Sequence, residues 1–210
     1  MSSSTKVPNP ENHASLENLV KNLKTSEEGK NQTSTSGAPV HLWNPDFCGK
    51  LDLIIEEDGT WTYNKTPIGR QKLVKLFASV IKREEGEYYL VTPVEKMLIE
   101  VKDVPFIITD MEIKQGDDGQ VISMGTNVGD RVEASTENPL RFQIQENQET
   151  LKPYIKIRHE GENVLEARLS RPVYYELANN IETETIDGEE FLGVWSHGTF
   201  FKIEKAENCQ

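Results

Sequence analysis

The segment from Trp43 to Val101 constrains the fold of this chain more than any other part of its 210 residues. It combines three proline-centred turns, an Asp-Gly turn and several aromatic residues around one short helical pattern. An Asp-Gly pair between alternating apolar residues is typical of a β-hairpin. We therefore predict a hairpin that turns at Asp58-Gly59, between the strands LDLIIEE and TWTYNK, with further strands at EYYLVT and MLIEV.

A short amphipathic helix is predicted between these strands. Thr66 would cap it and Pro67 would occupy its first position, where proline's missing N–H is harmless. Its buried stripe would be Leu73, Leu76, Phe77 and Val80, and we expect Lys82 and Arg83 near its C-terminal end. A second helical pattern runs from Ser15 to Lys24, with Leu16, Leu19, Val20 and Leu23 on one face. This helix either docks on the body of the protein or recruits a partner.

From Phe106 onward the pattern is mostly β. We predict strands at FIITDMEI, QVISMGTN, RVEA, LRFQIQ, YIKIR, VLEARLS, FLGVWS and TFFKIE, with hairpin turns at residues 116–119 and 197–198. The segment VYYELANNI is compatible with either a helix or an extended strand. GEYYLVTPV is similar to VLEARLSRPV, and Gly59-Thr-Trp61 is similar to Gly198-Thr-Phe200, which suggests a duplicated motif.

These patterns predict an α+β protein of two similar, small β-rich units in tandem, each with at most one helix. Residues 1–38 would hold a disordered tail, the short amphipathic helix and a linker. Residues 39–105 would form the first α+β unit, and residues 106–210 the second, mostly β unit.

The charge and the cysteine content narrow the class of protein. The net charge of −12 and the pI of about 4.9 disfavour nucleic acids and anionic membrane surfaces as partners. Only Cys48 and Cys209 are present, and no apolar run approaches a signal peptide or membrane span. The sequence therefore predicts a cytoplasmic protein without a structural disulfide.

No sequence motif assigns a reaction. Phosphate-binding glycine loops, the GxSxG elbow, CxxC pairs, HExxH and calcium loops are all absent. His41, Asp46 and Cys48 could seed a metal site, but they lack a second pair of ligands at metal-binding spacing. We therefore predict no cofactor, no metal and no catalytic residue, and favour a binding protein over an enzyme.

Two groups of polar residues are candidates for a site. The segment from Thr92 to Lys96 places polar groups around a rigid proline at the end of an apolar strand. Five arginines of the second half could converge on an anion, form salt bridges on the solvent face, or serve a protein interface; they are Arg131, Arg141, Arg158, Arg168 and Arg171. The predicted ligand contacts are Arg70, Thr92, Glu95, Lys96, Asn127, Arg131, Arg171 and Tyr174.

At WNPDFCGKLDL, DGTWTYNKTPIGR, LVKLFASVIKRE, YYLVTPVEK, TNVGD and RPVYYEL, the chain resembles the bacterial family called domain of unknown function 1285. The resemblance covers roughly Pro39 to Leu177 and, weakly, GVWSHGTFF. It implies two similar α+β units in cytoplasmic proteins without an established activity, with a suggested role in ligand binding or signalling. It carries over no catalytic residue, and Lys50 stands where the family usually has an acidic residue.

Three hypotheses on function follow. The first is a non-enzymatic binding or regulatory module, with a possible role in signal transduction, that recognises a small anionic ligand or a protein partner. The second is an unrecognised enzyme, such as a hydrolase that uses Glu95 or Asp52 as its base. The third is a homo-oligomeric scaffold that pairs through an exposed β edge.

Overall fold

The computed structural model describes Val20 and residues 38–117, 119–145, 148–160 and 163–206. Val20 is helical and packs, partly buried, against the hydrophobic core. The rest of the predicted N-terminal helix, the tail and most of the linker lie outside the described residues. Within those residues no helix is long and apolar enough to cross a membrane.

The first unit is a six-stranded sheet with one covering helix. Its strands stand in the order β3-β2-β1-β6-β5-β4, with a parallel pair, β1 and β6, at the centre and antiparallel pairs elsewhere. The strand bounds are β1 Phe47–Ile55, β2 Trp61–Tyr63, β3 Thr66–Pro67, β4 Ile81–Glu84, β5 Glu87–Val91 and β6 Lys96–Val101. The short 3-10 helix η1 (Val40–Leu42) precedes the sheet, and helix α2 (Gln71–Ala78) joins β3 to β4.

The second unit repeats this strand plan. Its order is β10-β11-β12-β7-β8-β9, again with the first and last strands, β7 and β12, as the central parallel pair. In both units, therefore, two antiparallel three-stranded meanders meet along one parallel pair. The bounds are β7 Phe106–Gly116, β8 Gly119–Thr126, β9 Arg131–Glu133, β10 Leu140–Gln145, β11 Gln148–Glu160 and β12 Asn163–Leu169.

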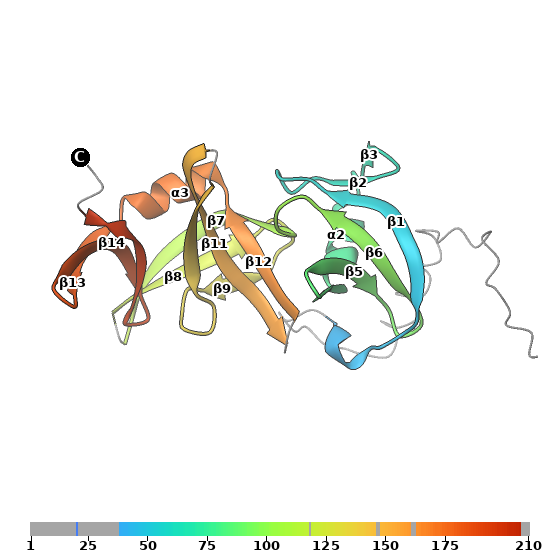
Figure 1. Ribbon diagram of the computed structural model, residues 1–210, viewed down its shortest axis with the longest axis horizontal. Coiled ribbons are helices and arrows are strands. Elements are labelled where there is room, and N and C mark those ends of the chain that lie inside the picture. Colours follow the sequence, from blue (N-terminus) through green and yellow to red (C-terminus); the bar gives the residue numbers. More distant parts are fainter. Residues whose placement is uncertain (1–19, 21–37, 118, 146–147, 161–162, 207–210) are drawn as a thin grey trace, which may run out of the picture.

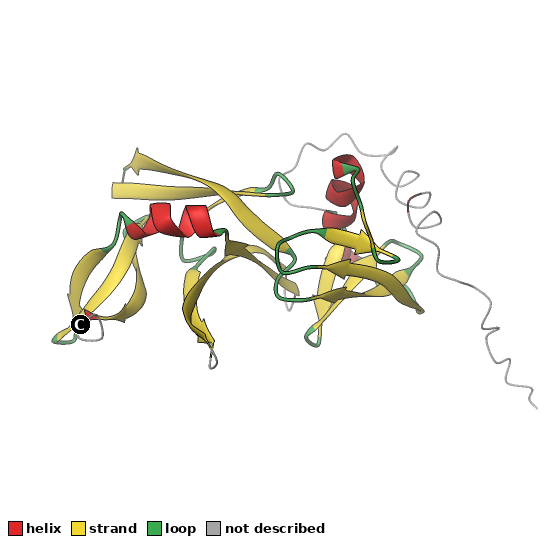
Figure 2. Ribbon diagram, turned by 90° about the horizontal axis from the view of Figure 1, so that it is seen from above, coloured by secondary structure: helices red, strands yellow, loops and turns green. Residues whose placement is uncertain are grey.

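A third, smaller sheet completes the chain. Helix α3 (Arg171–Ala178) follows β12 and leads into the antiparallel strands β13 (Glu182–Ile186), β14 (Glu189–Ser196) and β15 (Thr199–Lys205). The first unit, the second unit and this sheet lie in a row (Figure 1). Figure 2 shows α3 leading from the second unit to the third sheet. The chain is thus two tandem β-rich domains with few helices, and it is more β-rich than the predicted α+β class suggests.

The two sequence echoes do not fall on equivalent strands. GEYYLVTPV covers β5, the fifth strand of the first unit, whereas VLEARLSRPV covers β12, the sixth strand of the second. The Gly59 turn joins β1 to β2, but the Gly198 turn joins β14 to β15 in the third sheet. The likeness between the units therefore lies in their strand order and not in these sequences.

The predicted start of the first helix was wrong. Thr66 and Pro67 form β3, because Asn64 and Lys65 both take positive φ angles, 47° and 62°, and turn the chain back so that Thr66 pairs with Tyr63. The helix begins at Gln71 and ends at Ala78, so Val80 is buried outside it. Lys82 and Arg83 lie on strand β4 and not at the end of a helix.

The predicted hairpins at 58–59, 116–119 and 197–198 are all present. The open alternative at VYYELANNI is resolved in favour of a helix, α3. Strand β13 was missed because its sequence, ETETI, is polar. The Asp187-Gly188 pair that follows it, with φ angles of 56° and 85°, is a hairpin signal that would have revealed it.

One continuous hydrophobic core runs through both units, with Phe77 and Phe106 among its fully buried side chains. Polar contacts also join the units. The Gln71 side-chain amide donates to the Asn127 carbonyl (2.9 Å), and an Arg158 guanidinium nitrogen donates to the Ala78 carbonyl (2.7 Å) at the end of α2. The two sheets therefore pack as neighbours in direct contact.

Candidate functional site

A polar cleft of about 400 Å³ lies where edge strand β4 of the first unit meets the beginning of β12 in the second. This volume falls within the range of small-molecule sites. The cleft is lined by His41, Lys82, Arg83, Glu84, Glu85, Tyr89, Lys96 and Asn163. Seven of these residues come from the first unit and its η1 segment, and Asn163 comes from the second.

The register of two hairpin strands places the lining side chains. On β4 and β5, Lys82 pairs with Tyr89 and Arg83 pairs with Tyr88. The tight turn at Glu85-Gly86, where both φ angles are positive, keeps β4 beside β5. Buried Asn163 accepts a hydrogen bond from the backbone N–H of Arg83 (2.7 Å), so it fixes β4 against the second unit.

Glu84 lies between two lysines in this cleft. Its carboxylate oxygens accept separate bonds from Lys82 Nζ (2.7 Å) and from Lys96 Nζ. Hydrogen bonds from these two ammonium groups hold the Glu84 pKa below its ordinary value, because they favour the charged carboxylate. Lys96 Nζ also lies 4.4 Å from the centroid of the Tyr89 ring, and Lys82 also donates to the Trp43 carbonyl (3.2 Å).

The Tyr89 hydroxyl group is committed to a neighbouring carboxylate. It donates to Glu87 Oε2 at 2.8 Å. This bond to the protonated phenol raises the Tyr89 pKa to about 12. Tyr89 therefore presents a neutral ring and a fixed hydroxyl to the cleft at physiological pH, and it is poorly suited to proton transfer there.

Arg83 differs from Lys82 and Lys96 because it forms no ion pair with any side chain that the structure describes. Its Nε atom is buried and has no hydrogen-bond acceptor. Its guanidinium carbon lies 5.5 Å from the centroid of the Tyr88 ring, an arrangement that orients the group without neutralising it. A partly buried guanidinium without a carboxylate is suited to binding an anion.

Of the eight predicted contacts, Lys96 lines this cleft. Thr92 is fully buried, and its hydroxyl accepts the backbone N–H groups of Val94 (3.3 Å) and Glu95 (3.0 Å). It thus closes the turn between β5 and β6. Glu95 lies in that turn, half-buried, with its carbonyl accepting the Thr92 N–H (2.8 Å).

The other five predicted contacts lie outside the cleft. Asn127 Oδ1 accepts the Ile107 N–H (3.1 Å), so this side chain ties β7 to the end of β8. Arg131 on β9 is paired with Asp110. Exposed Arg70 and Arg171 precede α2 and open α3, and Tyr174 lies on α3 with its pKa raised by burial. Apart from Lys96, the predicted contacts do not line the cleft, and their roles as ligand contacts stay predictions.

Four of the five arginines in the second half form ion pairs. Arg131 and Arg141 pair at the surface with Asp110 and Glu166. The other two, Arg158 with Asp130 (2.5 Å) and Arg168 with Asp103 (3.3 Å), are mostly buried pairs and not salt bridges of the solvent face. They form where the second unit meets the first unit and the connecting segment, so their role in this arrangement is to hold the units together.

Sequence reasoning missed most of the cleft because Lys82, Arg83 and Glu84 were predicted in or after a helix. The available signal was the turn at Glu85-Gly86 between IKRE and EYYL, which is typical of a hairpin. Asn163 carries no such signal, because it meets Arg83 across 80 residues of chain.

Among the residues that the structure describes, the other candidate chemistries have no assembled site. Asp52, a base in the hydrolase hypothesis, is exposed on β1, and neither it nor Glu95 lines the cleft. Cys48 Sγ donates to the carbonyl of Asp46 (3.2 Å). Among the described residues no group of three His, Cys, Asp or Glu side chains is placed to hold a metal ion.

Comparison with known proteins identifies the family. Residues 38–104 match the N-terminal domain model of the domain of unknown function DUF1285, and residues 105–203 match its C-terminal domain model. No curated protein matches the chain. The crystal structure of a DUF1285 family protein from Silicibacter pomeroyi DSS-3 is similar, with 39% sequence identity, a TM-score of 0.76, and coverage of 90% of this chain and 96% of that one.

A second DUF1285 family protein, from Shewanella baltica OS155, shares 28% identity over 61% of this chain and 91% of its own, with a TM-score of 0.48. The family models together span both six-stranded sheets and the third sheet up to residue 203. The chain therefore belongs to the DUF1285 family.

Proposed function

We propose that this protein is a non-enzymatic binding module that holds a small anion, a carboxylate or a phosphate, in the cleft between its two units. The observation that carries this proposal is Arg83. Arg83 lines the cleft, its guanidinium lies near the Tyr88 ring, and it has no carboxylate partner among the side chains that the structure describes. A bound anion would accept bidentate hydrogen bonds from this guanidinium, which makes none to a carboxylate among the described side chains.

The charge of the cleft supports the same choice of ligand. Its lining has three cationic side chains and two carboxylates, so its net charge is +1 with His41 neutral. The whole chain carries −12. A local excess of positive charge on an acidic protein would attract a small anion, while the surrounding negative field disfavours an extended polyanion.

We further propose a regulatory role in signal transduction, which the position of the cleft supports. Arg83 is bonded through its backbone to Asn163 of the second unit, so an anion on Arg83 would act on the contact between the units. Binding to that contact would stabilise one arrangement of the two sheets over others. Through this change in the arrangement of the sheets, ligand binding could affect a partner without any catalytic group.

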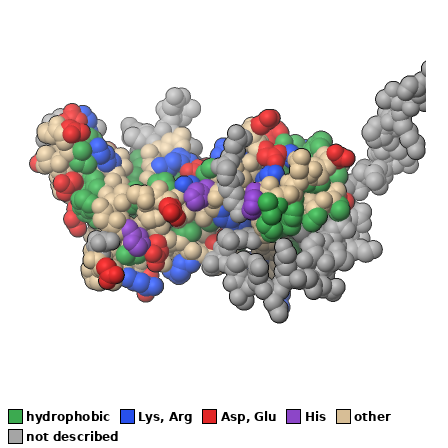
Figure 3. Space-filling model, turned by 90° about the horizontal axis from the view of Figure 1, so that it is seen from below, with side chains coloured by type: hydrophobic (Ala, Val, Ile, Leu, Met, Phe, Trp, Pro, Cys, Tyr) green, Lys and Arg blue, Asp and Glu red, His purple; other side chains and the backbone are tan. Residues whose placement is uncertain are grey.

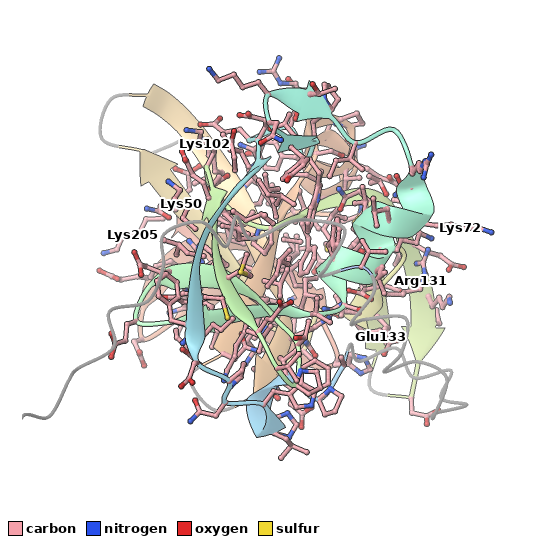
Figure 4. All side chains as sticks on the ribbon, turned by 90° about the vertical axis from the view of Figure 1, so that its right-hand side faces the viewer. Lys50, Lys72, Lys102, Arg131, Glu133 and Lys205 are labelled. Atoms are coloured by element: carbon pink, nitrogen blue, oxygen red, sulfur yellow. The ribbon has the colours of Figure 1, made fainter. Side chains whose placement is uncertain are left out.

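Thermal unfolding of the full-length protein with phosphate, acetate, nucleotides and sugar phosphates tests the proposal. A ligand at one hundred times its Kd stabilises the native state by about 2.7 kcal/mol. We expect one anion class to raise the melting temperature of the wild type and not of Arg83→Gln. Lys72→Gln is the matched control, because Lys72 is an exposed cation on α2 that points away from the ribbon (Figure 4).

Two outcomes would contradict the proposal. One is an unchanged melting temperature with every anion, together with a cooperative unfolding transition that shows an intact fold. The other is an equal anion-dependent shift in the wild type and Arg83→Gln. The scaffold hypothesis has a separate test, because a self-associating protein has a mass by light scattering that rises with concentration.

A further inference from the structure

We infer that the anion carries an apolar chain, so that the natural ligand is an amphiphile such as an alkyl carboxylate or an alkyl phosphate. This inference rests on the proposed function and names the class of its ligand. It comes from an exposed apolar surface beside the cleft, here called the apolar ledge, which consists of Leu42, Phe47 and Val94.

The ledge residues are unusually exposed for large apolar side chains. Their exposed fractions are 72% for Leu42, 59% for Phe47 and 64% for Val94. Only one other large hydrophobic residue of the described chain is comparably exposed, Tyr175 on α3. Single exposed apolar residues are ordinary, but a group of them beside a cleft is typical of a binding surface.

Phe47 contacts residues that line the cleft, and the other two ledge residues lie near lining residues in the chain. The Phe47 ring lies edge-on to the Tyr89 ring, with 6.5 Å between their centroids, and Phe47 pairs with Lys96 in the register of β1 and β6. Leu42 follows His41 in the chain, and Val94 precedes Lys96 by two residues. Figure 3 shows hydrophobic side chains gathered on one face of the first unit.

Charge complementarity decides which end of the ligand lies where. Arg83, Lys82 and Lys96 are in the cleft, so the acidic group binds there. The Tyr89 ring and Phe47 then continue the surface outward with apolar contacts, along which a chain attached to the acidic group would lie. The ledge is open and not enclosed, so it would contact only one side of that chain and leave the other side in water.

A homologous series of ligands separates the two parts of this site. We would titrate the full-length protein calorimetrically with acetate, butyrate, hexanoate and octanoate, and with alkyl phosphates of the same chain lengths. A fully buried methylene raises affinity about fourfold, and half-coverage on a ledge gives about twofold per methylene. From acetate to octanoate we therefore expect a rise in affinity of about sixtyfold.

Two variants show which residue sets the gain in affinity per methylene and which sets the affinity shared by all members of the series. Phe47→Ala should flatten the dependence on chain length, and because Phe47 is exposed its replacement should leave the fold intact. Arg83→Gln should weaken every member of the series by the same factor. Tyr175→Ala, which removes an equally exposed aromatic ring on α3, is the control and should change neither quantity.

The outcomes separate this inference from the proposed function. Binding of the short anions with no gain from a longer chain would overturn the apolar ledge and leave the anion site in place. A dependence on chain length that persists in Phe47→Ala would also overturn it. If no member of either series binds the wild type, the anion site itself is refuted.

Discussion

Replacing Gly59 with alanine would measure how tightly the first unit packs on the second. Gly59 lies in the β1–β2 turn with a φ angle of 84°, and an added Cβ would approach Ile107 Cγ1 to 2.7 Å and Asn127 Nδ2 to 3.0 Å. Neither neighbour moves freely. Ile107 is buried on β7, and Asn127 Oδ1 accepts the Ile107 N–H.

Two costs contribute to the expected effect. Alanine in the left-handed region costs about 1 kcal/mol relative to glycine. Forcing a methyl group into a packed contact adds about 1–3 kcal/mol. We therefore expect Gly59→Ala to lower the free energy of unfolding by about 2–4 kcal/mol.

Gly86 provides a matched control for the backbone cost. It lies in the β4–β5 turn with a φ angle of 87°, and an added Cβ would meet no atom within 4 Å. Gly86→Ala should therefore cost only about 1 kcal/mol. Urea unfolding followed by circular dichroism would compare the two variants with the wild type. Equal destabilisation by the two variants would refute the close contact between the Gly59 turn and the second unit.

Three further substitutions test particular contacts. Arg158→Met leaves Asp130 largely buried without its cation, so it should cost about 3 kcal/mol in urea unfolding; a loss below about 0.5 kcal/mol would contradict that role. Thr92→Val removes the acceptor of two backbone N–H groups and should cost about 1–2 kcal/mol while leaving anion affinity unchanged; a weakened affinity would instead support Thr92 as a ligand contact. Glu84 has a folded-state pKa below its ordinary value of 4.5, so its contribution to stability is present above that pH and is lost as the pH falls through the folded pKa. The free energy of unfolding of Glu84→Gln should therefore be about 1 kcal/mol lower than that of the wild type at pH 7. This difference should vanish in acid. A difference in the free energy of unfolding that does not depend on pH would refute the pairing of Glu84 with the lysines.

The sequence alone predicted those elements that depend on short-range chemistry. Asp58-Gly59, the 116–119 segment and His197-Gly198 each turn the chain within a few residues, so their hairpins could be predicted from the residues themselves. Alternating apolar residues such as Leu51, Leu53 and Ile55 likewise predict a strand with one buried face. A helix around Phe77 was also predicted, but its start was wrong and its buried residues are Val74, Phe77 and Ala78, with Leu73 and Leu76 only partly buried.

Where local signals compete, the sequence was less informative. Thr66-Pro67 carries the pattern of a helix start, but the preceding turn at Asn64-Lys65 pairs it with β2 as a strand. Thr92 is polar and ends an apolar strand, which is typical of a site, yet its hydroxyl is used to close the turn that follows. In both cases a neighbouring backbone bond decided the outcome, and residue type does not show which bond forms.

The candidate site was decided by the tertiary structure. Arg83 is one basic residue among several in the sequence, and the cleft that it lines is completed by Asn163, 80 residues later, which binds its backbone N–H. Phe47 and Lys96 are likewise brought together by the parallel pairing of β1 with β6, which are the first and last strands of their sheet in chain order. Turn chemistry and side-chain periodicity act over a few residues and can be recognised in the sequence. Contacts between distant strands depend on how whole sheets pack, and that packing is determined by the many buried side chains of the core acting together.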